Sequence, residues 1–166
     1  MNDLHLHGPH GAAGLLMVVG DRIPRALLAL RSGAVTHPHT WSVPAGALEA
    51  GEDPVHGALR EVAEELGDVP PLEVLGTVTD IVTPRWAFHT VIARTPACVP
   101  IRADGPDGWE IAGTRWVTRE SAERLPLHPR LRRTWPRLMD VATRRLHHAE
   151  LQDLVDPQGL AGILTG

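Results

Sequence analysis

The segment GALREVAEELGD, from Gly57 to Asp68, constrains the fold of this chain more than any other stretch of its sequence. On a helical wheel of about 100° per residue, the apolar side chains around it fall in one narrow stripe, which predicts a helix that packs on a core. Asp53 and Pro54 suit the first turn of this helix, and Gly67 suits its end. The stripe consists of Val55, Leu59, Val62 and Leu66.

The same helix carries Glu61, Glu64 and Glu65 on a different face, roughly 140° from the apolar stripe on the same wheel. Like charges three and four residues apart repel by a few tenths of a kcal/mol per pair. A solvated acidic face is one common explanation of such a cluster, and a bound cation is the other. Mg²⁺ prefers oxygen ligands, and substrate phosphate often completes its coordination shell. The cluster therefore raises the hypothesis of a divalent metal site.

Glycine and charged residues around this helix follow the pattern G-x5-E-x7-R-E-V-x-E-E-x-G, which begins at Gly46. This pattern resembles the Nudix box, the signature motif of Nudix hydrolases, over Gly46 to Asp68. The sequence departs from the motif at its last position. The Nudix box ends in an aliphatic residue, whereas this sequence has Asp68 there. The resemblance implies an α/β protein with the Nudix-type α/β/α sandwich, in which a mixed central sheet lies between helices.

The resemblance also implies roles for individual residues of the motif. It implies a Mg²⁺ cofactor, with Mn²⁺ as an alternative, and assigns catalytic positions to two glutamates of the helix. An ion pair between Glu52 and Arg60 is expected to lock the loop against the helix, although pairing of Arg60 with Glu64 one turn away is the simpler alternative. Gly46 and Gly67 are structural positions. The implied metal ligands are the backbone carbonyl of Ala45 and the carboxylates of Glu61, Glu64 and Glu65, the last two also being catalytic.

A third catalytic carboxylate is predicted on the loop DGPDGWEIAGTRWV, from Asp104 to Val117. Several Nudix hydrolases are similar in placing an acidic ligand or base just before a strand with an Arg-Trp or Glu-Trp pair. By this resemblance Glu110 is the candidate for that ligand or base, and which of the catalytic carboxylates, Glu64, Glu65 or Glu110, is the general base stays open. Asp104 and Asp107 remain alternatives on the same loop, and an exposed carboxylate without a catalytic role is the simplest reading.

The resemblance implies a substrate made of a nucleoside diphosphate linked to another group. Trp86 and Trp109 are candidates for stacking on a base, and Arg31 and Arg85 for binding phosphate, although packing is the commoner role of a tryptophan. Pro84 stands sixteen residues after Asp68, which resembles ADP-ribose-cleaving members and slightly favours an ADP-ribose-like substrate. The alternatives are an oxidised nucleoside triphosphate and a catalytically silent, nucleotide-sensing module.

The length of 166 residues suits a single domain over 1–166, with a flexible segment at 1–11 and a tail at 153–166. Strands are predicted at 13–19, 26–31, 72–82, 87–94 and 114–117, with a short extended piece around 41–43. A short helix is predicted at 119–124. Apolar residues at helical intervals predict a longer helix from about Pro136 to Leu151, with Pro136 in its first turn.

Composition excludes several classes of function. The net charge of −4 gives no electrostatic footprint for duplex nucleic acid or for an anionic membrane surface. The single cysteine, Cys98, rules out an intrachain disulfide and is compatible with a reducing cytoplasm, where we expect this protein. The absence of lysine excludes lysine catalysis. We therefore expect a small nucleotide-type molecule as the partner, and the resemblance adds a possible homodimer.

Overall fold

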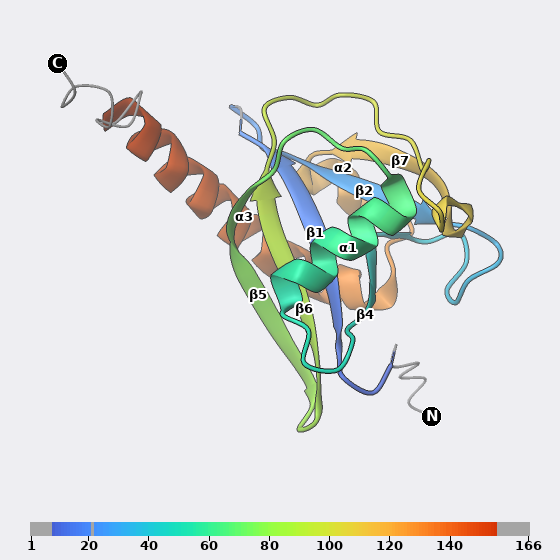
Figure 1. Cartoon of the computed structure of the whole chain (residues 1–166). Coiled ribbons are helices and arrows are strands. Elements are labelled where there is room, and N and C mark those ends of the chain that lie inside the picture. Colours follow the sequence, from blue (N-terminus) through green and yellow to red (C-terminus); the bar gives the residue numbers. More distant parts are fainter. Residues whose placement is uncertain (1–7, 21, 156–166) are drawn as a thin grey trace, which may run out of the picture.

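The computed structural model describes residues 8–20 and 22–155, and its centre is a mixed sheet (Figure 1). Its strands run in the order β3-β2-β1-β6-β5, with β4 beside β1 and β7 beside β2. Only the contact of β1 with β6 is parallel among the strand pairs of these residues. The strands are β1 (Ala12–Val19), β2 (Arg25–Arg31), β3 (Trp41–Ser42), β4 (Ala45–Ala47), β5 (Glu73–Thr83), β6 (Trp86–Arg94) and β7 (Ile111–Val117).

Helices cover both faces of this sheet, which makes the fold an α/β/α sandwich, as the sequence predicted. They are α1 (Pro54–Leu66), the 3-10 helix η1 (Gly108–Glu110), α2 (Arg119–Glu123) and α3 (Pro129–Val155). Figure 1 shows α1 crossing one face of the sheet and α3 running behind the other. Strand β1 is buried along its whole length, and its side chains alternate between two cores. Leu15 and Met17 pack with α1, whereas Leu16 and Val18 pack with α3.

Strand β1 changes partner along its length, and this change positions the Nudix-like motif. Its first residues, Ala12–Gly14, pair with β4, and its last two, Val18 and Val19, pair with β2. Gly14 permits the close approach, because a Cβ there would lie 2.7 Å from the Cβ of Ala45. The pairing holds Ala45 and Gly46 at the sheet, where they face the glutamates of α1.

The predicted start of the long helix at Pro136 is wrong: α3 begins at Pro129, and Pro136 lies inside it. Leu131 and Trp135 continue the buried stripe before Pro136, so packing outweighs the backbone hydrogen bond that the proline cannot donate. The first turn is capped by His128, whose Nδ1 accepts from the Arg130 amide at 3.2 Å.

The ends of the chain are described only in part. Residues 1–7 and 156–166 lie outside the described residues, so the predicted flexible segment and tail stay predictions there. Residues 153–155, predicted as tail, are the last turn of α3, and Asp153 pairs with Arg94 at 2.7 Å. Within residues 8–20 and 22–155, every helix is too short or too polar to cross a membrane.

Candidate active site

Helix α1 is built as its sequence predicts at both ends. The carboxylate of Asp53 accepts hydrogen bonds from the amides of Val55 and His56 at 2.9 and 3.3 Å. Gly67 ends the helix at a φ of +72°, which glycine adopts without strain. Val62 and Leu66 of the predicted stripe are buried, whereas Val55 and Leu59 are only half-buried. The buried face also includes Ala58 and Glu65, which lie four residues before and three residues after Val62. Glu65 therefore faces inward, although the helical wheel placed it on a different face from the apolar stripe.

The glycine of β4 makes room for the first glutamate of the cluster. A Cβ at Gly46 would lie 2.1 Å from the carboxyl carbon of Glu61, so no larger residue fits without displacing that carboxylate. Burial raises the pKa of Glu61, against the hydrogen bond from Arg60, which lowers it. The site thus holds a half-buried carboxylate directly against a strand backbone.

Arg60 binds the acidic residues of the motif through its whole guanidinium group. Its Nε and Nη2 donate to the two oxygens of Glu52 at 2.9 and 3.0 Å, which is the predicted ion pair. Nη2 also donates to the Ala47 carbonyl at 2.9 Å, and Nη1 donates to Glu61 at 2.8 Å and to Glu64 at 2.9 Å. The pairing with Glu64 that was the alternative is thus present as well. These contacts tie the loop after β4 to α1.

Glu65 is the most unusual carboxylate of the site. It is only 4% exposed, and its Oε2 is buried without a hydrogen-bond donor among the described residues. Burial, followed by the charges of Glu61 and Glu110, raises its pKa from 4.5 to about 8, against a hydrogen bond from the Ala45 backbone. A buried carboxylate with a free oxygen requires either a proton or a cation at neutral pH.

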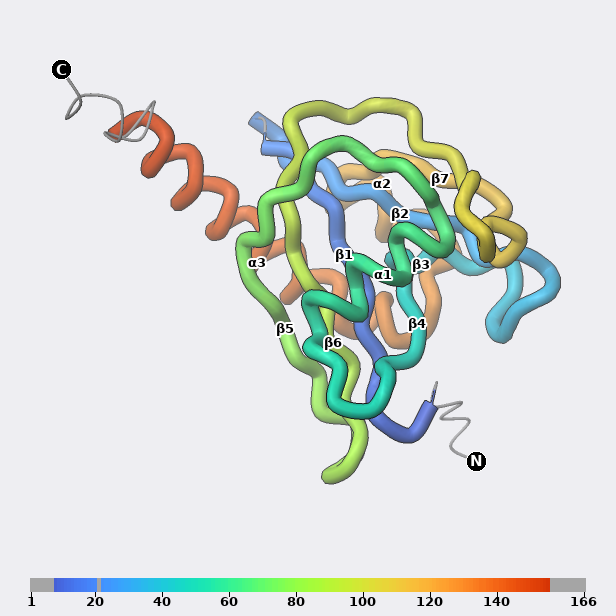
Figure 2. Tube along the Cα trace, in the orientation of Figure 1, coloured from blue at the N-terminus to red at the C-terminus, as the bar shows by residue number. Residues whose placement is uncertain are grey.

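Glu110 lies close enough to this pair to raise the pKa of both Glu61 and Glu65. It is brought there by the loop before β7, which Figure 2 shows alongside the end of α1. The amide of Asp107 donates to the Glu64 carbonyl at 2.7 Å, and the Glu110 carbonyl accepts from Ser32 at 2.8 Å. Burial and Asp107 raise the pKa of Glu110 itself. The loop thus adds a fourth carboxylate to the glutamates of α1.

The loop is fixed to α1 by glycine, which yields a first prediction. A Cβ at Gly105 would lie 2.2 Å from the carbonyl oxygen of Glu64, so Gly105→Ala is expected to push the loop and Glu110 off the helix. Overpacking of this kind costs about 1–3 kcal/mol. The matched control is Gly113→Ala, where a Cβ meets nothing within 4 Å. Thermal unfolding of both variants checks the prediction, which is contradicted if their melting temperatures are equal.

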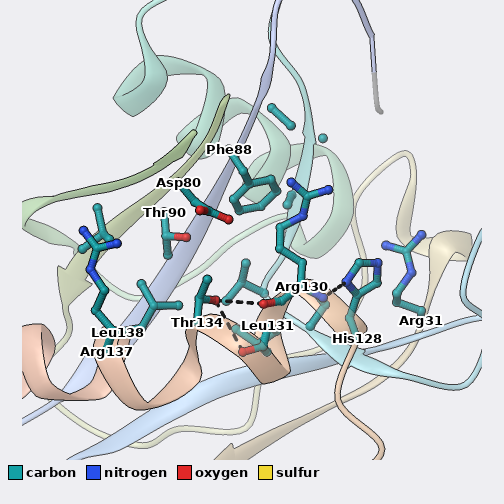
Figure 3. Close-up of a pocket in the computed structure, with 16 residues that line it drawn as sticks. Arg31, Asp80, Phe88, Thr90, His128, Arg130, Leu131, Thr134, Arg137 and Leu138 are labelled. Carbon is teal, nitrogen blue, oxygen red and sulfur yellow. Dashed lines mark hydrogen bonds between the residues drawn. The ribbon is translucent and has the colours of Figure 1, made fainter. Parts of the chain in front are cut away.

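A narrow cleft opens beside this site on the α3 face of the sheet (Figure 3). Ala45, Gly46 and Arg31 line it at the end near the glutamates. Arg31 is held by two hydrogen bonds to Thr36, at 2.7 and 3.1 Å, and its charge acts on Glu65 and Glu110. The rest of the lining comes from the sheet, from α3 and from the residue that precedes α3. The sequence interpretation missed its polar members, which are Ser42, Asp80, Thr90, His128, Arg130, Thr134 and Arg137.

Only one of the four predicted substrate contacts lines this cleft. Arg31 does, whereas Arg85 lies in the exposed turn between β5 and β6. Trp86 is 4% exposed, and its indole donates to the Gly8 carbonyl at 3.0 Å, so its predicted stacking on a base is wrong. Trp109 is 59% exposed and donates to Asp107 at 3.3 Å, outside the cleft. Periodicity does not distinguish a strand that begins at Trp86 from a loop that ends there.

The carboxylates fit a divalent ion in charge and in donor type. The free Oε2 of Glu65 and the contact of Glu61 with Gly46 leave oxygen ligands next to the backbone of Ala45. In the described part of the chain, however, no three His, Cys, Asp or Glu side chains converge into a ready-made metal site. One reason is visible, since Glu61 and Glu64 each give an oxygen to Arg60.

Comparison with known proteins identifies the class to which this fold and site belong. The family model described as the NUDIX domain matches residues 8–138. The chain therefore belongs to the Nudix family.

Individual relatives agree with this assignment. A Mycobacterium tuberculosis protein named "Putative 8-oxo-dGTP diphosphatase 3" is 34% identical over 139 residues, which cover 79% of this chain and 62% of that protein. The chain thus spans less than two thirds of this curated relative. The crystal structure of RenU, a Nudix hydrolase from M. smegmatis, is 30% identical with a TM-score of 0.67, covering 82% of this chain and 88% of RenU. The NUDIX domain of Shewanella oneidensis NrtR, solved with ADP ribose, is 20% identical with a TM-score of 0.57 over 88% of this chain and 94% of that one, which shows the fold alone.

Proposed function

We propose that this protein is a metal-dependent pyrophosphohydrolase that cleaves a phosphoric anhydride in a nucleoside diphosphate linked to another group. The observation that carries the proposal is the buried oxygen of Glu65 that has no hydrogen-bond partner among the described residues. Glu65 is hydrogen-bonded to the backbone of Ala45, and Ala45 lines a cleft to which Arg31, Arg130 and Arg137 also contribute. A polyphosphate would meet cationic side chains in that cleft, with carboxylates suited to a divalent ion at its end.

The residues that would hold the ion are Glu61, Glu64 and Glu65, with the backbone of Ala45. Glu64 would have to exchange Arg60 for the ion, and at 38% side-chain exposure it is the most accessible of the three partners of that arginine. When bound, Mg²⁺ or Mn²⁺ neutralises phosphate charge and lowers the pKa of water. Arg60 would remain on Glu52 and keep the loop in place.

Glu110 is the proposed general base. Its proximity to Glu61 and Glu65 supports this role, and burial that raises its pKa favours the uptake of a proton. Arg31 is a second contributor, because its position between the carboxylates and the cleft suits the binding of a phosphate oxygen. Asp107 already accepts from Trp109, which makes it the weaker candidate.

Two substrate classes fit this proposal. Pro84 suggested an ADP-ribose-like molecule, but it lies in the turn between β5 and β6 and does not line the cleft. The name of the M. tuberculosis relative supports a nucleoside triphosphate instead. Product analysis separates the two, since ADP-ribose yields AMP and ribose phosphate, whereas a triphosphate yields a monophosphate and pyrophosphate. A silent sensing module would bind nucleotides, seen as a rise in melting temperature, and release no product.

Metal binding provides the direct test. We expect Mg²⁺ or Mn²⁺ to give saturable heat in calorimetry and, at a hundred times its dissociation constant, to stabilise the fold by about 2.7 kcal/mol. Because the ion competes with the proton on Glu65, the stabilisation at fixed metal concentration should grow between pH 6 and pH 9. An exposed-site control, Glu120→Gln, should bind the metal unchanged. Heat that does not saturate would mean that the acidic face is only solvated.

A further inference from the structure

Two arginines act on the carboxylates of the site, and they are held by different kinds of group. Arg60 donates to three glutamates, so carboxylates in direct contact compensate its charge. Arg31 forms no ion pair within residues 8–20 and 22–155, and its charge acts on Glu65 and Glu110 without direct contact. Figure 3 shows Arg31 at one end of the labelled residues that line the cleft. Its positive charge is therefore available to a ligand in the cleft.

Both acceptors that hold the Arg31 side chain are neutral and belong to one residue. Nε donates to the carbonyl of Thr36 at 2.7 Å, and Nη2 donates to the hydroxyl of Thr36 at 3.1 Å. Two such bonds fix the planar guanidinium without neutralising it. Nη1 has no acceptor among the described residues, and it is not one of their fully buried polar atoms. A half-buried cation without a counter-ion favours the binding of an anion at this open position.

The segment that carries Thr36 forms a closed loop on Arg31. The amide of Arg31 donates to the Thr40 carbonyl at 2.9 Å, and the carbonyl of Arg31 accepts from the His39 amide at 3.0 Å. Inside the loop, the Thr40 hydroxyl donates to the His37 carbonyl at 2.7 Å. The ring of His37 lies against that of His128, with the ring centres 4.5 Å apart, and His128 lines the cleft. The loop is thus fastened to the strand that bears Arg31 and to the wall of the cleft.

The backbone of this loop is strained directly after Thr36. His37 and His39 have φ angles of +50° and +60°, in the left-handed region that residues other than glycine seldom adopt. Such residues persist where the surrounding structure holds them, and they are common near functional sites. The first residue of the loop, Ser32, donates its amide to the Glu110 carbonyl at 2.8 Å. One short loop therefore contacts both the cation of the cleft and the proposed general base.

We propose that Thr36 is a positioning residue for Arg31, which it holds with neutral acceptors so that Nη1 and the positive charge stay available to a phosphate oxygen of the substrate. This inference rests on the proposed function, in which Arg31 binds that oxygen. Valine at position 36 keeps the shape of threonine and the backbone acceptor, but it removes the hydroxyl. The guanidinium then loses one of its two fixed points and binds phosphate less well.

The test measures the affinity for α,β-methylene-ADP by calorimetry in the presence of Mg²⁺. This probe carries a diphosphate core whose bridge is not an anhydride. Thr36→Val should weaken binding roughly 3- to 10-fold, as expected for one hydrogen bond, and Thr36→Ser should restore the wild-type affinity. The matched control is Thr77→Val, an exposed threonine of β5 whose hydroxyl makes no hydrogen bond among the described residues. With a nucleotide that is hydrolysed, Thr36→Val should raise KM by the same factor and leave kcat nearly unchanged.

A double-mutant cycle separates positioning from a general effect on the loop. In the Arg31→Ala background, Thr36→Val should cause no further loss of affinity, because Thr36 acts only through Arg31. This pattern of binding without hydrolysis of any nucleotide would refute the proposed function and leave the role of Thr36 intact. An unchanged affinity in Thr36→Val, an equal loss in both backgrounds, a failure of serine to restore binding, or no binding by the wild type would overturn it.

Discussion

Replacing Glu65 with glutamine is expected to lower kcat/KM by a factor on the order of 10²–10⁴ while leaving the protein folded. The carboxylate is the most buried member of the acidic cluster, and its free Oε2 is the proposed ligand atom. Glutamine has nearly the same shape, but it carries no negative charge to offset that of a divalent ion. Steady-state hydrolysis with Mg²⁺ and with Mn²⁺ measures the loss, and the exposed Glu120→Gln should retain the wild-type rate.

The same substitution is expected to lower activity but to raise the stability of the metal-free protein at high pH. A loss of activity can therefore be distinguished from a loss of folding. The folded-state pKa of Glu65 is about 8 and its ordinary value is 4.5, so between these values the folded protein holds a proton that the unfolded chain has released. The wild type therefore loses stability as pH rises from about 4.5 to 8, by an amount on the order of a few kcal/mol. Without metal, Glu65→Gln should match the wild type near pH 4.5 and exceed its melting temperature at pH 9. A lower melting temperature at pH 9 would contradict this account.

Replacing Arg60 with alanine is the substitution with the largest expected cost in stability. Arg60 is the cation for Glu52, Glu61 and Glu64, and it also donates to the Ala47 carbonyl. Its hydrogen bonds lower the pKa of Glu52 to about 2. Breaking a largely buried ion network by removing one partner costs about 3–5 kcal/mol, and partial exposure reduces this to about 2–4 kcal/mol here. The melting temperature should fall by roughly 5–15 °C in metal-free buffer.

Two further variants sharpen that measurement. Arg60→Lys keeps the charge but loses the planar fork that binds both oxygens of Glu52, so it should recover only part of the stability. Arg119→Ala removes a partly exposed arginine with two carboxylate partners and should cost at most about 1 kcal/mol. Saturating Mg²⁺ should stabilise Arg60→Ala more than the wild type, because the ion replaces the missing cation. If Arg60→Ala unfolds at the temperature of Arg119→Ala, the network contributes little.

The elements that could be predicted from sequence are those whose information is local. The cap at Asp53, the stop at Gly67 and the buried run of β1 follow from side-chain chemistry and from periodicity within a few residues. The sandwich and the Glu52–Arg60 pair were implied by the resemblance of the motif to the Nudix box. The start of α3 was wrong because a proline suits the first turn of a helix, and only the packing of Leu131 and Trp135 shows that the helix has already begun.

The sequence by itself determined which acidic residues gather on one helix and which motif they form. Only the tertiary structure decided that Glu65 points inward with a free oxygen, because its environment is made by β4 and by the loop of Glu110, which lie far from it along the chain. The cleft could not be predicted from the sequence for the same reason. Asp80 and Arg130 both line the cleft but are separated along the chain by β6, η1, β7 and α2, and no local pattern places them together. Their meeting depends on α3 packing across β5 and β6, which is a long-range contact set by the two cores.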